Sequence, residues 1–154
     1  MQTIQILALG KCKEDYLRKG CAEYEKRLSR FCKLEPVSLQ QNPGKREISQ
    51  ALEKEGEMLR KRMRGYCVAM CIEGKQLDSY KYAQTLEHTA VEYDGGNVTF
   101  CIGSSYGLAN SVKHRANLRL SMSAMMFPHQ LARLMLLEQI YRGYQILAGA
   151  KYHK

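Results

Sequence analysis

The 154-residue sequence has no long apolar segment: no stretch approaches the ~20 apolar residues that a membrane-spanning helix requires. It also contains no GxxxxGK[ST] phosphate-binding loop, no HExxH zinc motif and no paired carboxylates at catalytic spacing. These absences argue against a membrane protein, a P-loop nucleotide hydrolase, a metalloprotease and a glycosidase. Acidic residues are scarce toward the C-terminus, so we expect no metal-binding centre there.

The six cysteines form no CxxC pair, and no second pair at zinc-ligand spacing follows Cys67 and Cys71. No signal peptide precedes the first apolar run, which is short and partly polar. We therefore expect free, buried thiols in a reducing compartment, and a cytoplasmic protein.

The composition is that of an ordinary globular domain, with 45% hydrophobic and 25% charged residues. At this length we expect one domain that spans residues 1–154. The formal net charge is +9, and residues 103–154 contain seven basic side chains against one acid, Glu138. Six of the nine excess positive charges therefore lie in the last third of the chain. This asymmetry has two interpretations: a polyanionic ligand near that region, or a solvated basic surface.

Short apolar runs alternate with amphipathic segments along the chain, which is typical of a parallel α/β sheet. Strands are predicted at residues 3–9, 33–39, 66–72 and 98–102, and in the β-like run 118–127. The nearly continuous apolar character of 66–72 indicates a central strand covered on both faces. Helices are predicted at 14–32, at 46–64, from the N-cap Asp78 to Tyr93, and at 129–147. The predicted buried stripe of the second helix is Ile48, Leu52, Leu59 and Met63.

The last predicted helix, 129–147, carries apolar side chains in almost every direction around its axis. A surface helix normally has a single apolar stripe, so a helix that is apolar all round is covered on more than one side. A domain of this size offers little to cover the outer face. We therefore predict a homodimer with this helix in the contact.

Two turns follow predicted strands and lead toward helices: 103–107 and 122–127. In open α/β sheets, ligands bind at the carboxyl ends of strands. These turns offer backbone hydrogen-bonding groups beside hydroxyls and an apolar wall, a surface that suits a flat base, a ribose and a soft thioether. Met70, at the end of its strand, either extends that wall or packs in the core.

Polar side chains on the last helix and in the tail are further candidates for chemistry. Glu138 and Arg142 lie four residues apart in the acid-before-base order, and form either a surface ion pair or a partly buried, oriented pair. His129 either contacts a ligand or only completes the packing. The tail 151–154 is either frayed or docked near the turns, where its ring, imidazole and ammonium groups would meet a base or a phosphate.

Several motifs, in order along the chain, resemble those of a known family. They are Gly10-Lys11, Lys54-Glu-Gly56, Ile72-Glu-Gly-Lys75, Phe100-Cys-Ile-Gly103, Gly107-Leu108, Leu120-Ser-Met-Ser-Ala124, Phe127-Pro-His-Gln130, Leu137-Glu-Gln-Ile-Tyr-Arg142 and Tyr152-His-Lys154. Over essentially its full length the sequence resembles the SPOUT-class methyltransferases that methylate N3 of a pseudouridine in 23S rRNA. The resemblance implies a single-domain α/β fold with a C-terminal trefoil knot, a homodimer, and S-adenosylmethionine as the methyl donor.

The resemblance also implies roles for residues of this chain. The donor pocket would consist of Met70, Gly103, Met122, Ser123, Ala124, Met125, Met126 and Phe127. Catalysis or RNA binding would involve Glu138, Arg142, Tyr152 and His153. We expect Arg142, held by Glu138, to stabilise the imide anion of the base. His153 is the candidate proton acceptor, and Tyr152 is expected to position the base.

The sequence departs from the family pattern at two positions. The family usually has a second glycine after Gly103, where this chain has Ser104, and a proline before the Tyr-His of the tail, where this chain has Lys151. A Cβ at position 104 would narrow the donor pocket or disfavour a positive φ, and loss of the proline would loosen the tail. We expect both changes to affect affinity more than the type of reaction.

The resemblance further implies that assembled ribosomes, rather than free rRNA, are the substrate, recognised by shape and by phosphate contacts. Two alternatives stay open. One is a related knotted methyltransferase that acts on tRNA ribose, and the other is a non-catalytic protein that binds RNA or the ribosome. Neither a membrane nor a metal partner is expected.

Overall fold

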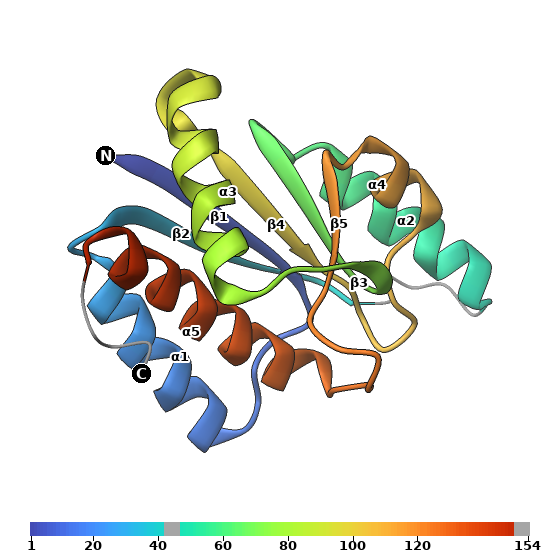
Figure 1. The fold of residues 1–154 in the computed structure, drawn as a ribbon. Helices are drawn as coiled ribbons and strands as arrows, with labels where there is room; N and C mark the ends of the chain where they lie inside the picture. The colour runs from blue at the N-terminus through green and yellow to red at the C-terminus, as the bar shows by residue number, and fades with distance from the viewer. Residues whose placement is uncertain (42–46, 150–154) are drawn as a thin grey trace.

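In the computed structural model, which describes residues 1–41 and 47–149, five parallel strands form one sheet in the order β2-β1-β4-β3-β5 (Figure 1). The strands are β1 (Gln2–Leu9), β2 (Cys32–Leu39), β3 (Tyr66–Gln76), β4 (Val98–Ile102) and β5 (Leu118–Ser121). The helices are α1 (Asp15–Leu28), α2 (Ile48–Arg60), α3 (Ser79–Glu92), α4 (Asn110–Arg115) and α5 (His129–Leu147), with a short 3-10 turn η1 (Asp94–Gly96). The predicted single-domain α/β architecture with a parallel sheet is confirmed.

Two separate apolar clusters show that helices cover both faces of the sheet. Ile4 and Ile6 of β1 pack with α1, α3 and α5, whereas Leu7 and Leu9 of the same strand pack with α2 and α4. Figure 1 shows the same division, with α1, α3 and α5 on one side and α2 and α4 on the other. Because successive side chains of a strand point to opposite faces, β1, β2, β3 and β4 each contribute to both clusters, whereas the short β5 contributes Leu118 and Leu120 to the first cluster.

The helix boundaries differ from the sequence prediction at both early helices. The first was expected to continue to residue 32 but ends at Leu28, because the chain turns there and Cys32 begins the pairing of β2 with β1. The second was expected to include residues 61–64, yet α2 ends at Arg60. Ile48 was wrongly placed in its buried stripe: it lies in the first turn of α2 and is 54% exposed. The third helix begins as predicted, because the Asp78 carboxylate accepts a hydrogen bond from Lys81 N at 2.8 Å.

β3 is an interior strand between β4 and β5, but it is longer and less covered than predicted. It continues four residues beyond Ile72 to Gln76, and its pairing with β5 shifts register between Met70 and Lys75. Residues 67–69 are buried, whereas Ile72 is 47% exposed. The expectation of cover on both faces therefore applies only to the first half of the strand.

Within the chain, α5 lies between α1 and α3 (Figure 1). Gly20 of α1 approaches Leu134 closely, and Gly143 approaches Leu86 of α3 at a distance that leaves no room for a Cβ. Leu136, Leu137 and Ile140 point into the core. α1 and α3 thus cover parts of the α5 surface that the sequence analysis had assigned to contact with a second copy of the chain. None of the helices in the described ranges is long and apolar enough to cross a membrane.

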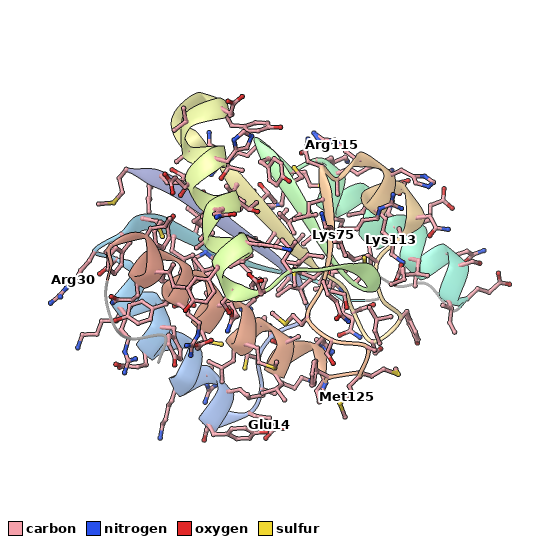
Figure 2. The ribbon with its side chains drawn as sticks, viewed as in Figure 1. Glu14, Arg30, Lys75, Lys113, Arg115 and Met125 are labelled. Carbon is pink, nitrogen blue, oxygen red and sulfur yellow. The ribbon has the colours of Figure 1, made fainter. Side chains whose placement is uncertain are left out.

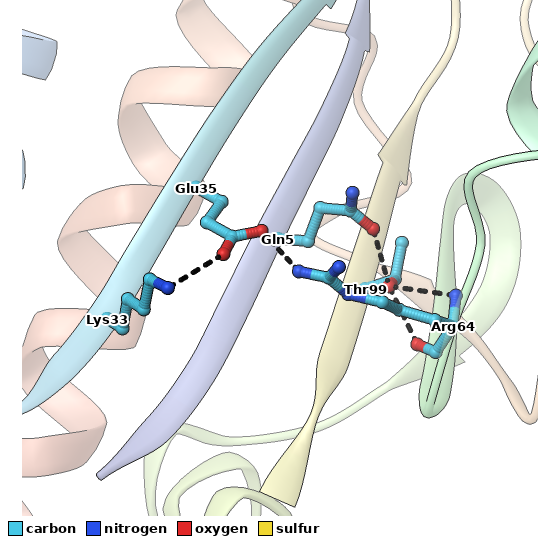
Figure 3. Close-up of polar contacts among 5 residues, drawn as sticks. All are labelled: Gln5, Lys33, Glu35, Arg64 and Thr99. Atoms are coloured by element: carbon cyan, nitrogen blue, oxygen red, sulfur yellow. Dashed lines mark hydrogen bonds and ion pairs between the residues drawn. The ribbon is translucent and has the colours of Figure 1, made fainter. Parts of the chain in front are cut away.

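A row of polar side chains crosses the amino half of the sheet (Figure 3). Gln5 of β1 stands opposite Glu35 of β2 and Thr99 of β4. The Thr99 hydroxyl lies 3.0 Å from Gln5 Oε1 and donates to the carbonyl oxygen of Arg64 at 2.8 Å. The Arg64 guanidinium pairs with Glu35, which also lies 3.6 Å from Lys33 Nζ. We call Gln5, Lys33, Glu35, Arg64 and Thr99 the amino-half row.

Candidate functional site

A cavity of about 570 Å³ lies where β4 and β5 end, beside the middle of β3. The loop 103–107 after β4 and the loop 122–127 after β5 form two of its walls, and β3 beyond Ala69 forms the third. We call it the donor cavity. Among the residues that the sequence analysis assigned to the methyl donor, those that line it are Met70, Gly103, Met122, Ser123, Met125, Met126 and Phe127. Ala124 is exposed on the same loop and does not line it.

The loop 103–107 is closed by its own backbone. Gly107 N donates to the carbonyl oxygen of Ser104 at 2.8 Å, and Gly107 has a φ of 84°, in the left-handed region that favours glycine. A Cβ on Gly103 would lie 2.4 Å from the carbonyl carbon and oxygen of Gly107. Glycine at 103 therefore allows the two ends of the loop to touch.

The loop 122–127 presents thioether side chains to solvent at the mouth of the cavity. Ser121 Oγ donates to the carbonyl of Ser123 at 2.9 Å, and Met125 N donates to Ser123 Oγ at 3.0 Å, so the turn is held by local hydrogen bonds. Met125 and Met126 are 73% and 87% exposed, and Figure 2 shows Met125 directed away from the body of the protein. The cavity thus has an exposed apolar rim.

The third wall carries a charged pair that the sequence analysis missed. Lys113 of α4 lies 2.5 Å from Glu73 of β3, and both line the donor cavity. The hydrogen bond from Lys113 lowers the pKa of Glu73 below its usual value, so the carboxylate is ionised at neutral pH. The neighbouring Cys71 thiol has a raised pKa because burial disfavours the thiolate, and the charge of Glu73 acts in the same direction. The extension of β3 past residue 72 brings these groups to the cavity.

All six cysteines are free, as predicted, but only four are buried; Cys12 and Cys71 are partly exposed. Burial raises the pKa of Cys21 and Cys32 to about 11 and that of Cys101 to about 12. These thiols are therefore protonated at neutral pH and act as small apolar side chains.

A second, larger cavity of about 930 Å³ adjoins the donor cavity, and the two share Pro128 and His129. Lys11 and Lys13, from the segment between β1 and α1, line it, and we call it the basic cleft. Burial lowers the pKa of His129, so its ring is neutral at pH 7. His129 thus borders both cavities, each of which is large enough for a ligand. This position fits the interpretation in which its ring contacts a ligand.

Gln130 holds the wall of the basic cleft against the end of β1. Its Nε2 donates to the carbonyl oxygen of Gly10 at 3.2 Å. Its Oε1 is buried and has no hydrogen-bond partner among the described residues. The cleft therefore offers a buried acceptor beside two lysines.

Glu138 and Arg142 form the oriented, partly buried pair that the sequence analysis weighed. Arg142 Nε and one terminal nitrogen lie 2.9 and 2.5 Å from Glu138 Oε1, and Gln139 Nε2 donates to Glu138 Oε2 at 2.7 Å. The side chains of Arg142 and Glu138 are only 26% and 20% exposed. Neither lines the donor cavity; Glu138 lines another cavity of about 650 Å³, between α5 and the segment that precedes α3, which shares Leu120 and Met122 with the donor cavity. Tyr152 and His153 lie outside the described residues.

Sequence reasoning found the two loops but not the whole lining of the donor cavity. The additional lining residues include Cys71, Ile72, Glu73, Lys113 and Ala132. Lys113 lies in α4, which follows the turn 103–107. That position was the only feature of the sequence that could have indicated that Lys113 reaches the cavity. In the described ranges, no group of three or more His, Cys, Asp or Glu side chains is arranged to hold a metal ion.

Comparisons with known proteins show the family to which this chain belongs. Residues 1–153 match the family described as "Predicted SPOUT methyltransferase". Proteins named "Ribosomal RNA large subunit methyltransferase H" from Leuconostoc mesenteroides and Clostridium beijerinckii are each 44% identical to this chain, and one from Streptococcus sanguinis is 45% identical. Each alignment covers 98% of this chain and 99% of the relative. The chain belongs to the SPOUT methyltransferase family.

Proposed function

We propose that this protein transfers a methyl group from S-adenosylmethionine to N3 of a pseudouridine in 23S rRNA, on assembled ribosomes. The observation that carries the proposal is the donor cavity, which is built from two loops at strand carboxyl ends in a chain of the SPOUT methyltransferase family. The relatives' shared name supports large-subunit rRNA as the substrate. Because ribosomes are cytoplasmic in bacteria, the proposal includes a cytoplasmic location.

The donor cavity fits the size and chemistry of S-adenosylmethionine. Its volume of about 570 Å³ falls within the ~300–1,000 Å³ of typical small-molecule sites. Ile102, Leu108 and Leu120 supply apolar surface for a flat base, and the backbone of the two loops supplies hydrogen-bonding groups for a ribose. When bound, the cofactor would supply an electrophilic methyl group on a positively charged sulfur. The Glu73–Lys113 ion pair lies on the same cavity and adds no net charge beside this cation.

The base must lose its N3 proton as the nitrogen attacks the methyl carbon in line. We assign stabilisation of the resulting imide anion to Arg142, which Glu138 holds by two hydrogen bonds. The proton acceptor in this proposal is His153, and Tyr152 positions the base. A neutral His129, at the junction of the two cavities, lines the path of the base toward the donor.

Arg142 lies outside the donor cavity of its own chain, so we propose that a second copy completes the active site. Glu138 lies nine positions after His129 in α5, which is about 14 Å along the helix axis from the cavity. A homodimer in which α5 meets its counterpart would bring Arg142 and the tail of one chain toward the donor cavity of the other. The proposal also includes a C-terminal trefoil knot, the topology implied by the family resemblance.

Positive charge at the basic cleft supports binding of RNA phosphates. Lys11 and Lys13 line the cleft next to the donor cavity, where the acceptor nucleotide would enter. Phosphate contacts give affinity without sequence information, so the shape of the assembled ribosome would select the nucleotide. Binding should therefore weaken as salt rises.

The decisive experiment is a methyl-transfer assay on ribosomes that lack this modification, with mass spectrometry of the modified nucleotide. We expect 3-methylpseudouridine on the 23S rRNA of assembled ribosomes, and little product on free 23S rRNA. A 2′-O-methylated tRNA product would show the tRNA ribose alternative instead. RNA binding without calorimetric binding of S-adenosylmethionine or S-adenosylhomocysteine would show the non-catalytic alternative.

A further inference from the structure

Ser104, one of the two residues that depart from the family pattern, contacts the buried carboxyl group of Glu55 in α2. Ser104 Oγ donates to Glu55 Oε1 at 2.9 Å, and the two residues are 49 positions apart in the chain. Glu55 is 1% exposed and Ser104 is 5% exposed, so water does not compete for this hydrogen bond.

The same hydroxyl also orders the loop 103–107. Tyr106 N donates to Ser104 Oγ at 3.3 Å, while Gly107 N donates to the Ser104 carbonyl. The Glu55 carboxyl oxygen accepts the hydrogen bond from the hydroxyl, which leaves the lone pairs of Ser104 Oγ available to the backbone of the loop. The Ser104 side chain thus connects α2 to the backbone of the loop 103–107, which lines the donor cavity.

Glu55 is itself held in a fixed position, because α2 packs closely on the segment that follows the loop. A Cβ on the adjacent Gly56 would lie 2.9 Å from Ala109 Cβ and 3.2 Å from Ser111 Oγ. Ala51 and Leu59, one turn to either side of Glu55, are 1% and 0% exposed. The carboxylate therefore sits on a rigid support rather than on a mobile surface helix.

We propose that Ser104 and Glu55 are positioning residues that hold the loop 103–107 in its donor-binding conformation. This inference rests on the proposed function, since it takes the donor cavity as the site of S-adenosylmethionine. A glycine at 104 would supply no hydroxyl, so the loop would have to be ordered when the donor binds. The hydroxyl orders it beforehand, which lowers the entropic cost of binding.

The test is calorimetric binding of S-adenosylhomocysteine, together with methylation kinetics on ribosomes. We expect Ser104→Ala to raise the Kd and the donor KM about tenfold, with kcat at saturating donor and the KM for ribosomes unchanged. Ser104→Gly should weaken binding further, because it also frees the backbone. Glu55→Gln keeps an acceptor of the same shape and should cost about threefold.

A double-mutant cycle separates a shared role from two independent ones. If the residues act through one another, the Ser104→Ala/Glu55→Gln protein binds no more weakly than Ser104→Ala alone. Ser111→Ala is the matched control, since Ser111 also bonds a side chain of α2, Arg60, but is exposed and outside the cavity. Its Kd should equal that of the wild type.

Unchanged donor binding in both Ser104→Ala and Ser104→Gly would overturn the inference, as would simple additivity in the cycle. Failure of the wild-type protein to bind the donor would overturn the proposed function and this inference with it. Thermal unfolding without ligand identifies any variant that fails to fold, in which case Glu55→Gln, which conserves shape, decides the outcome.

Discussion

In the amino half of the sheet, polar side chains bond one another across neighbouring strands, whereas at the carboxyl ends the chain turns away and leaves two adjoining cavities. The amino-half row is buried at its centre, where Thr99 is 0% exposed and Gln5 is 7% exposed (Figure 3). At the other end, the backbone of the loops 103–107 and 122–127 lines open space.

The difference shows how one sheet separates stability from binding. In the amino half, buried polar atoms contact other protein atoms, and an unmade hydrogen bond there costs stability. At the carboxyl ends, polar groups and apolar rims border space that a ligand can fill. Substitutions in the two regions should therefore change different measurements.

The largest effect on binding is expected from Gly103→Ala. Its Cβ would lie 2.4 Å from the Gly107 carbonyl, and backbone on both sides of the contact cannot move aside as a side chain does. We expect the Kd for S-adenosylhomocysteine, measured by calorimetry, to rise about 10- to 100-fold. Gly20→Ala is the control, because its new Cβ would meet only the end of the Leu134 side chain. Equal Kd values for the two variants would break the proposed link between loop closure and binding.

The amino-half row should show the opposite behaviour. Thr99→Val keeps the shape of the side chain but leaves the Arg64 carbonyl without the hydroxyl that now donates to it. We expect the free energy of unfolding in urea to fall by about 1–3 kcal/mol, with the donor Kd unchanged. A variant of normal stability that binds the donor poorly would contradict the division between the two regions.

Substitutions in the basic cleft should affect the ribosome and not the donor. Lys11→Gln and Lys13→Gln each remove one positive charge beside the donor cavity. Each should reduce the slope of log affinity against log salt by about 1 if its lysine contacts a phosphate. Ribosome binding at several salt concentrations measures this, with Lys26→Gln on α1 as the control. If neither substitution changes this salt slope, the RNA does not bind at the basic cleft.

The smallest effect concerns the reactivity of Cys71 in the donor cavity. Its pKa is raised, so the thiolate fraction at neutral pH is lower than for a free thiol, and alkylation should accelerate as the pH rises toward that higher pKa. S-adenosylhomocysteine should slow the reaction by covering the thiol. Peptide mass spectrometry after iodoacetamide treatment gives the rates, with Cys12, outside that cavity, as the internal comparison. If S-adenosylhomocysteine does not change the alkylation rate of Cys71, the donor binds away from β3.

Much of the candidate site was predictable because it is local in sequence. The turns after β4 and β5 follow apolar runs directly, and the Asp78 cap lies beside its helix, so short-range patterns were sufficient. The exposure of Ile48 was not predictable in this way. Helical spacing gives a stripe, but only the packed structure shows that the first turn of α2 extends beyond its neighbours.

Periodicity and motifs in the sequence determined the alternation of strands and helices, the two glycine- and methionine-bearing loops and the family resemblance, because these depend on neighbouring residues. The tertiary structure alone decided that α1 and α3 flank α5, that Lys113 meets Glu73, and that Ser104 meets Glu55. These contacts join residues tens of positions apart. They depend on the order of strands in the sheet and on the register shift in β3, neither of which a local pattern specifies.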